Sequence, residues 1–250
     1  MERIGPRFGV NRFMAYFNDY SATYAPVETL KALYSEALSH EKVVGLAVGT
    51  RPDCLPPEVL DLLADFASKT CLWVELGLQT ATQETLDLVG REHTVEEFIS
   101  AARALDAIGA LVCAHVILGL PGEEQSHHHK TAELIRSLPI AGVKIHNLHI
   151  LRGSRWEKEY QEGRIEIPTL DEHADAVVDF LEQIPPRVVI HRIIGDAPVD
   201  WLVAPKWCMQ KQTAIRAVRS LFHKRNTWQG KAIRGHEQEK NVKPNNPYCS

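Results

Sequence analysis

Apolar, strand-like runs recur along this chain, and five of them end abruptly in polar or glycine-rich residues. Parallel α/β folds gather binding and catalytic groups at the C-terminal ends of their strands, so we expect these five polar ends to open onto one crevice. The runs begin at Val43, Leu72, Val112, Val143 and Val188.

The lengths of chain between these runs fit repeated strand–helix units. Counted between central residues, successive runs are 30, 39, 31 and 45 residues apart, and each interval contains a segment with helical apolar periodicity. A right-handed parallel crossover needs a connection of this size. The pattern therefore predicts an α/β fold built on a parallel sheet.

Local helix signals support these crossovers. Pro56 and Pro57 begin one helix, and Thr94 with Glu97 forms a capping box for another, which ends at Gly109. Further helices are predicted over residues 26–40, 124–138, 170–184 and 210–224, and the segment FMAYF from Phe13 is predicted to be a short strand.

Composition and charge narrow the class of protein. The chain has 250 residues, of which 44% are hydrophobic and 24% charged. This composition predicts one soluble domain over residues 1–227, followed by a frayed polar tail over 228–250. It contains no run long enough to span a bilayer and no signal-peptide pattern, so we expect a cytoplasmic protein without a membrane partner. The net charge of -4 argues against nonspecific nucleic-acid binding, and the basic cluster between Lys211 and Lys231 is interpreted as a solvated helix face.

The cysteines do not form a recognisable site. All five are far apart in the sequence, whereas metal and cluster sites usually draw two or more ligands from one short loop. An odd number of scattered thiols does not indicate a disulfide framework either, so we expect most to be free. They are Cys54, Cys71, Cys113, Cys208 and Cys249.

The sequence contains 12 histidines, but their positions give only weak evidence for a metal site. Strand alternation would send His146 and His149 to opposite faces, so they could not share a metal without a bulge. Inward groups from several strand ends, His146, His191 and Asp196, remain the alternative site of a barrel metal-dependent hydrolase. The favoured interpretation of any single one is a hydrogen-bonded core histidine.

Two segments carry polar groups that need an explanation. Alternation places Glu75, Gly77 and Gln79 on one face of an apolar strand, where a buried carboxylate needs a ligand or a partner such as Arg51 or Lys144. In ILGLPGE, Gly119 and Gly122 permit close backbone approach, Pro121 stiffens the turn, and Glu123 can accept a hydrogen bond. The loop is either a cofactor cradle or a simple strand-to-helix turn.

Six motifs in order resemble the radical S-adenosylmethionine (radical SAM) superfamily. They are VGTRPD at Val48, ELGLQT at Glu75, ILGLPGE at Ile117, KIHNLHI at Lys144, HRIIGDAP at His191 and LVAPKWC at Leu202. The resemblance covers roughly residues 13–208 and is closest to the uncharacterised branch related to the elongator catalytic subunit and the oxygen-independent coproporphyrinogen oxidase. It implies a partial parallel (β/α) barrel that holds SAM across its strand ends beside a 4Fe-4S cluster.

The resemblance also implies roles for individual residues. Asn18 stands where relatives commonly have glutamine near the SAM amino group, and Lys144, His146, His191 and Arg192 fall in the substrate cavity. The substrate itself is unknown, with RNA as one candidate. The implied SAM contacts are Tyr16, Asn18, Thr50, Arg51, Glu75, Gln79, Thr80, Gly119, Pro121, Gly122 and Glu123.

One departure from the family limits the implied function. Relatives bind three irons of the cluster through three closely spaced cysteines after the first barrel strand, and no such spacing occurs in this sequence. We therefore expect a truncated member that lacks the first strand and the cluster loop and is inactive alone. Besides the hydrolase, the alternative is a noncatalytic remnant or scaffold whose exposed edge near Phe13 needs a covering partner.

Overall fold

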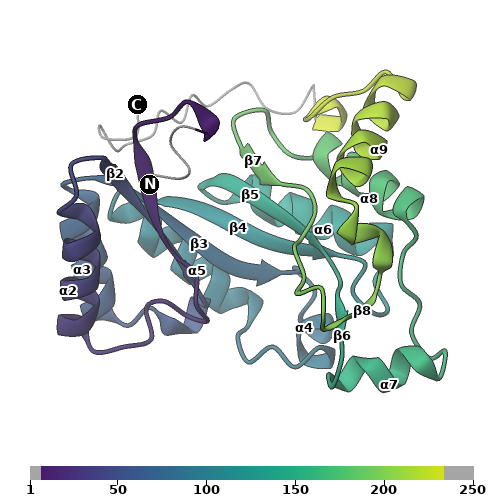
Figure 1. Cartoon of the computed structure of the whole chain (residues 1–250), viewed down its shortest axis with the longest axis horizontal. Helices are drawn as coiled ribbons and strands as arrows, with labels where there is room; N and C mark the ends of the chain where they lie inside the picture. Colours follow the sequence, from purple (N-terminus) through teal and green to yellow (C-terminus); the bar gives the residue numbers. More distant parts are fainter. Residues whose placement is uncertain (1–6, 234–250) are drawn as a thin grey trace.

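Six parallel strands form a curled sheet in the computed structural model of this protein, in the spatial order β1-β2-β3-β4-β5-β7 (Figure 1). The structure describes residues 7–233. In this part of the chain β1 and β7 are the two edges, so the sheet is a half-barrel and the predicted partial parallel barrel is confirmed. The strands are β1 (Phe13–Phe17), β2 (Val43–Thr50), β3 (Cys71–Gln79), β4 (Leu111–Leu118), β5 (Ile140–Asn147) and β7 (Val189–Arg192).

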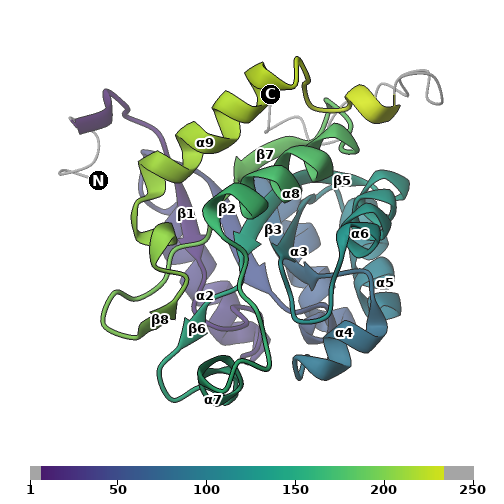
Figure 2. The same ribbon diagram turned by 90° about the vertical axis from the view of Figure 1, so that its right-hand side faces the viewer.

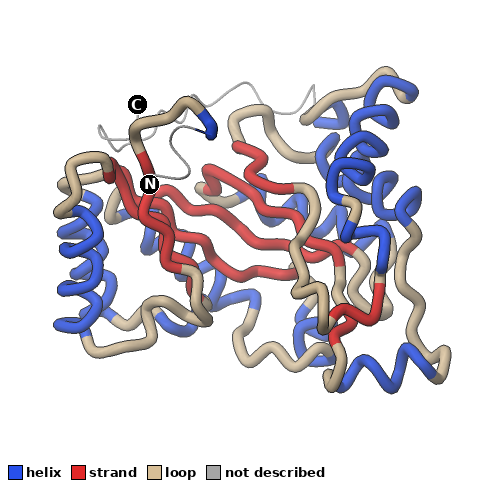
Figure 3. The backbone as a smooth tube through the Cα atoms, in the orientation of Figure 1, coloured by secondary structure: helices blue, strands red, loops and turns tan. Residues whose placement is uncertain are grey.

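Helices connect the strands and surround the sheet (Figures 2 and 3). The predicted capping box is confirmed, because the Glu97 backbone N–H donates to Thr94 Oγ1 at 3.1 Å at the start of α5. The helices are α2 (Val27–Leu38), α3 (Pro57–Ala67), α4 (Gln83–Leu88), α5 (Val95–Ala107), α6 (Gln125–Ser137), α7 (Arg155–Gln161), α8 (Leu170–Glu182) and α9 (Lys211–Lys224), with single 3-10 turns at η1 (Pro52–Cys54), η2 (Lys206–Met209) and η3 (Lys231–Ile233). None of the helices in residues 7–233 has the length and apolar character needed to cross a membrane.

Alternation along the strands gives the sheet two unlike faces. Leu46, Val74, Val112 and Ile145 are fully buried in the hydrophobic core with helix side chains such as Phe98. Burial of this apolar surface holds the outer face of the sheet to its helices. The positions that alternate with the core residues face the concave interior and, apart from Trp73, include many small or polar residues, among them Ala47, Gly49, Glu75, Gly77, Cys113, His115 and Lys144.

Two strands are shorter than their apolar runs suggested. β5 ends at Asn147, after which Ile150–Leu151 (β6) pairs antiparallel with Leu202–Ala204 (β8) in a separate small sheet. β7 ends at Arg192, and the chain from 193 to 201 forms no strand or helix. The small sheet holds this connection beside the end of β5.

The expected tail begins inside the described part. The Gln229 side chain donates to the carbonyls of Pro185 and Val188, and the Gly230 N–H donates to the Leu181 carbonyl. These bonds join residues 229–230 to the domain. The rest of the expected tail, residues 234–250, lies outside the described residues.

Candidate functional site

Four strands contribute one hydrogen-bonded cluster to the concave interior. The Glu75 carboxylate of β3 accepts a hydrogen bond of 2.5 Å from the Tyr16 hydroxyl of β1 and lies 3.0 Å from His115 Nε2 of β4. The Lys144 ammonium of β5 bonds to the same carboxylate and donates to the Tyr16 hydroxyl at 3.2 Å. Lys144, one of the partners considered for Glu75, is therefore confirmed.

This cluster holds its acid in the charged form. Burial alone would raise the pKa of Glu75, but hydrogen bonds from His115, Lys144 and Tyr16 together lower it to about 2. Burial and the Glu75 carboxylate raise the pKa of the Tyr16 phenol. The interior therefore contains a charged Glu75–Lys144 pair with a neutral phenol beside it.

Two aromatic rings lie over Gly142 on the N-terminal side of this cluster. The rings of Trp73 on β3 and His191 on β7 pack edge to face, with centroids 4.6 Å apart. They leave no space for a side chain on Gly142, whose Cβ would lie 2.6 Å from His191 Nε2. Alternation could have identified Trp73 as an inward residue, because it lies two positions before Glu75.

The end of β2 is held by internal bonds. The Thr50 and Thr23 hydroxyl oxygens are 2.5 Å apart, and Thr23 donates to the Cys54 carbonyl at 2.6 Å. The Arg51 guanidinium binds Asp53 at 2.6 Å and Glu92 at 2.8 Å. The alternative pairing of Arg51 with Glu75 is therefore wrong, since the two acidic partners of Arg51 lie outside the sheet, Asp53 in η1 and Glu92 in the connection before α5.

The end of β3 is strained and lies beside an arginine without a partner. Gln79 adopts a left-handed φ of +68° at a bulge, and its Nε2 lies 2.8 Å from where a Cβ on Gly77 would be. Such a backbone costs about 1–2 kcal/mol, and strain of this kind clusters at functional sites. Arg91 Nη2 lies 3.9 Å from the same Cβ position, and the guanidinium makes no hydrogen bond or ion pair with any residue between 7 and 233.

Arg91 was missed by the sequence analysis. Burial lowers the pKa of its guanidinium, but an arginine remains charged at neutral pH. An unpaired, half-buried cation at a strand end is the group that an anionic ligand needs. Its position in the connection after β3 was the only signal in the sequence, and that signal does not show where the side chain points.

The glycine loop after β4 has the backbone that its sequence predicts. Gly119 and Gly122 have φ values of +88° and +79°. Glu123 follows Gly122 and accepts a hydrogen bond of 2.5 Å from the Thr80 hydroxyl, so the loop is joined to the end of β3. Burial raises the pKa of Glu123.

Asn18 and His146 border the interior at its two edges. A Cβ on Gly49 of β2 would lie 2.9 Å from Asn18 Oδ1, which places the Asn18 amide over β2. At the other edge a Cβ on Gly195 would lie 3.0 Å from His146 Nδ1 and 2.8 Å from His149 Cε1. The prediction that these two histidines face opposite sides is wrong, because β5 ends at Asn147 and strand alternation stops before residue 149.

The alternative metal site does not form. His191 packs on Trp73, and the Asp196 carboxylate is bound by Lys211 at 2.7 Å and by Arg192 at 3.3 Å. Among residues 7–233, no three histidine, cysteine, aspartate or glutamate side chains are grouped so that they could hold a metal ion.

The free thiols among residues 7–233 lie on separate elements. Cys54 lies in η1, Cys113 in β4 and Cys208 in η2, and Cys113 is fully buried. A 4Fe-4S cluster needs several thiolates held together, and three thiols on separate elements do not supply them.

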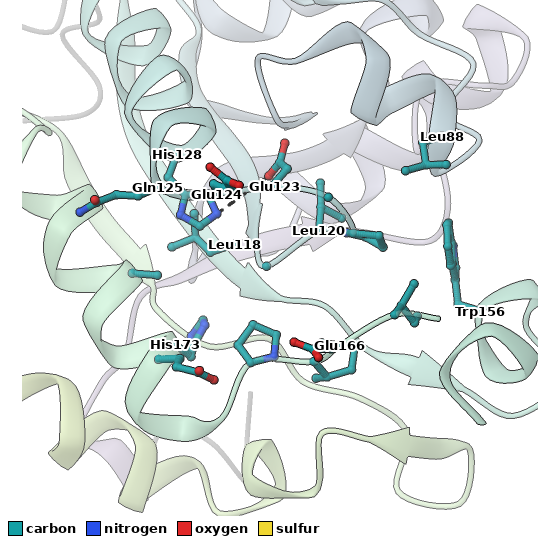
Figure 4. Close-up of a pocket in the computed structure, with 18 of the residues that line it drawn as sticks. Leu88, Leu118, Leu120, Glu123, Glu124, Gln125, His128, Trp156, Glu166 and His173 are labelled. Atoms are coloured by element: carbon teal, nitrogen blue, oxygen red, sulfur yellow. Dashed lines mark ion pairs between the residues drawn. The ribbon is translucent and has the colours of Figure 1, made fainter. Parts of the chain in front are cut away.

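A hollow of about 1020 Å³ lies on the other side of the glycine loop, between that loop, α7 and the start of α8 (Figure 4). Leu118, Leu120, Trp156 and Glu166 line it, and at its inner end His128 Nε2 lies 4.0 Å from a Glu123 carboxylate oxygen. The hollow shares the glycine loop with the interior site, but Glu75, Gln79 and Lys144 are not part of its lining.

Comparison with known proteins identifies the family. Residues 3–135 match the radical SAM superfamily, and residues 140–224 match the radical SAM C-terminal domain. The chain belongs to the radical SAM superfamily. This radical SAM chain is 37% identical over 237 residues to the uncharacterised protein YtqA of Bacillus subtilis, covering 95% of the chain and 74% of YtqA.

More distant relatives have named activities or solved structures. The tRNA uridine(34) acetyltransferase of Methanocaldococcus jannaschii is 30% identical over 174 residues, which are 68% of this chain and 31% of that protein. The Elp3 structure from Methanocaldococcus infernus superposes with a TM-score of 0.77 at 19% identity, over 91% of this chain and 58% of Elp3. The structure of coproporphyrinogen III oxidase of Escherichia coli superposes with a TM-score of 0.52 at 18% identity, over 68% of this chain and 40% of that enzyme. These two structures support the fold.

Proposed function

We propose that this chain is the SAM-binding and substrate-binding part of a radical SAM enzyme. The observation that carries the proposal is the unpaired Arg91 guanidinium beside Gly77 and the strained Gln79, at the end of an interior strand. Arginine is suited to bind a carboxylate through two parallel hydrogen bonds. The methionyl carboxylate of SAM supplies that partner.

The residues present fit SAM in other respects. Gly122 has a left-handed backbone with nothing within 4 Å of where a Cβ would be, so the loop backbone is open to an adenine ring. Asn18 directly follows β1, and Gln79 is the last residue of β3. Their side-chain amides are available to the amino group and the ribose of SAM. When bound, SAM supplies a 5'-deoxyadenosyl radical on reductive cleavage.

Six of the candidate SAM contacts are already used internally, and we assign them a supporting role. Tyr16 and Glu75 bond to each other in the interior cluster. Thr50 bonds to Thr23, and Arg51 bonds to Asp53 and Glu92. Thr80 and Glu123 bond to each other. These pairs hold the ends of β2, β3 and β4 in position, so the groups left for direct contact are those of Asn18, Gln79, Arg91 and the glycine loop.

Cleavage of SAM needs a 4Fe-4S cluster as well as a SAM-binding site. Because the free thiols of residues 7–233 do not fit a 4Fe-4S cluster, radical chemistry requires cluster thiolates from another source. We therefore propose that the chain alone binds SAM without cleaving it.

RNA is the substrate class that we propose. One relative with a named activity is a tRNA uridine(34) acetyltransferase. In this chain the substrate would contact Lys144, His146, His191 and Arg192, with Lys144 held by Glu75 and Arg192 held near Asp196.

Titration with S-adenosylhomocysteine tests the proposal, because this analogue keeps the adenosyl and carboxylate groups and cannot be cleaved. Isothermal titration of the purified chain should give one site, and Arg91→Ala should weaken binding at least tenfold. Arg219→Ala is the matched control, since Arg219 is an exposed arginine on α9 without a partner in the described part of the chain. Absence of binding to the wild-type chain, as the scaffold alternative expects, or equal affinity of the two variants would contradict the proposal.

A further inference from the structure

Two histidines at the β5 edge of the interior have unused nitrogens. The Nε2 atoms of His146 and His149 are buried and have no hydrogen-bond partner within residues 7–233. Buried polar groups in folded proteins are almost always paired, so an unpaired nitrogen indicates a ligand or another function. Two such atoms three residues apart form a polar feature of the interior that the structure leaves unexplained.

Both rings are held in place by the same neighbour. Gly195 approaches the Nδ1 edge of His146 and the Cε1 atom of His149, and its N–H donates to Asn147 Oδ1 at 3.2 Å. Since His146 meets Gly195 through its Nδ1 edge, its Nε2 lies on the far edge of the ring, away from Gly195. The His146 ring is 5.3 Å from that of His115, which binds Glu75 and so connects the pair to the central cluster.

Both imidazoles are neutral at physiological pH. Burial lowers the pKa of His146 to about 3, with His115 and Arg192 as further causes, and burial also lowers the pKa of His149. A neutral imidazole offers one directional hydrogen bond at Nε2, as donor or acceptor according to its tautomer. The pair therefore suits a neutral polar group better than an ion.

The surroundings favour a flat ligand. The His146 ring packs beside the planar ring of His115, and the second ring pair, Trp73 with His191, lies farther toward the N-terminal ends of the strands, over Gly142. Sites that take in a single nucleobase combine such planar walls with hydrogen bonds to the edge of the base.

We propose that His146 and His149 form a subsite that recognises the hydrogen-bonding edge of a nucleobase. The inference rests on the proposed function, because it names the group of the RNA substrate that enters the interior. The pair lies beside Gly195, in the connection between β7 and β8 that has no regular structure. The same chemistry is offered by a free nucleoside and by a base in a single-stranded RNA.

Imidazole nitrogen NMR tests this subsite on the full chain. The protein is labelled with ¹⁵N-histidine and saturated with S-adenosylhomocysteine, so that the proposed adenosyl site is filled. It is then titrated with each of the four ribonucleosides and with short single-stranded RNA. We expect the Nε2 signals of His146 and His149 to shift with at least one base and that of His223 to stay unchanged, because His223 is exposed on α9.

Variants assign the signals and test the affinity. His146→Gln and His149→Gln keep a polar side chain of similar length but remove the imidazole ring. Each should therefore weaken base binding at least tenfold, whereas His223→Gln should not. Tighter binding of RNA than of the nucleoside identifies a base within RNA as the ligand, and equal affinity identifies a free nucleoside. If neither probe moves the two signals of a protein that does bind S-adenosylhomocysteine, the subsite is refuted while the proposed function stands.

Discussion

The Tyr16 hydroxyl donates a hydrogen bond of 2.5 Å to the Glu75 carboxylate and so joins edge strand β1 to β3 across the interior. The bond passes over β2, where Ala47 is opposite Tyr16 in the sheet and Gly49 is opposite Glu75. Larger side chains at these two positions would separate the hydroxyl from the carboxylate. The small residues of β2 and the polar residues of β1 and β3 therefore form one structural unit.

Removing the Glu75 charge should destabilise the protein strongly. Glu75→Gln leaves the Lys144 ammonium buried without its counter-ion, and breaking a buried pair in this way costs about 3–5 kcal/mol in the free energy of unfolding. The double variant Glu75→Gln/Lys144→Met should recover most of this loss, because no charge is left unpaired. Urea denaturation measures both values.

The exposed pair Lys69–Asp65 provides the control for this prediction. Its side chains are 62% and 48% exposed, so Asp65→Asn should change the free energy of unfolding by no more than about 1 kcal/mol. If Glu75→Gln costs as little as Asp65→Asn, the interior cluster does not stabilise the fold.

The effect of Glu75→Gln should depend on pH. The pKa of Glu75 is lowered to about 2 in the folded protein, whereas an unfolded glutamate has a pKa of about 4.3. A lowered carboxyl pKa stabilises the fold fully above the unfolded pKa, and this stabilisation is lost as the pH falls through the folded pKa. The difference in unfolding free energy between wild type and Glu75→Gln should therefore narrow between about pH 5 and pH 2.

Denaturation at a series of pH values checks this narrowing. The neutral buried histidines also destabilise the fold in acid, but they are present in both proteins, so their contribution largely cancels in the difference. A difference that stays constant from pH 5 downward would show that Glu75 is not held in its charged form.

The two glycines of the loop after β4 should respond differently to alanine. Both have left-handed backbones, which cost a non-glycine residue about 1–2 kcal/mol. A Cβ on Gly119 would also lie 2.7 Å from Pro168 Cγ, whereas a Cβ on Gly122 would have nothing within 4 Å. Gly119→Ala should therefore lower the free energy of unfolding by at least about 1 kcal/mol more than Gly122→Ala. Equal losses, measured by chemical denaturation, would mean that Pro168 moves aside without cost.

The main elements of the fold could be predicted from the sequence because their signals are local. Apolar runs located β2, β3 and β4, alternation placed Glu75 and Gln79 on one face of β3, and the box of Thr94 and Glu97 located the start of α5. The ends of β5 and β7 could not be predicted in this way. Their apolar runs continue beyond Asn147 and Arg192, but Ile150–Leu151 instead pairs with Leu202–Ala204, far away in the sequence, and residues 193–201 form no strand.

In the candidate site, too, only the features with a local signal could be predicted from the sequence. A carboxylate in an apolar strand requires a partner or a ligand, and this was enough to name Lys144, alongside Arg51, as a candidate partner of Glu75. No local rule places the Arg91 guanidinium beside Gly77 or brings His149 next to His146, because both arrangements depend on how irregular connections fold back over the strand ends. These two features carry the proposals above.

The β1 edge should promote self-association. Met14 and Tyr16 on this edge strand are 39% and 47% exposed, and an edge strand with apolar side chains is a template for pairing with another chain. A lysine on such an edge opposes pairing, so Met14→Lys should shift the protein toward monomer in sedimentation velocity experiments at rising concentration. Leu33→Lys is the control, because Leu33 is 45% exposed on α2 and outside the sheet, so it should leave association unchanged. A wild-type chain that stays monomeric at every concentration would show that this edge needs no covering partner.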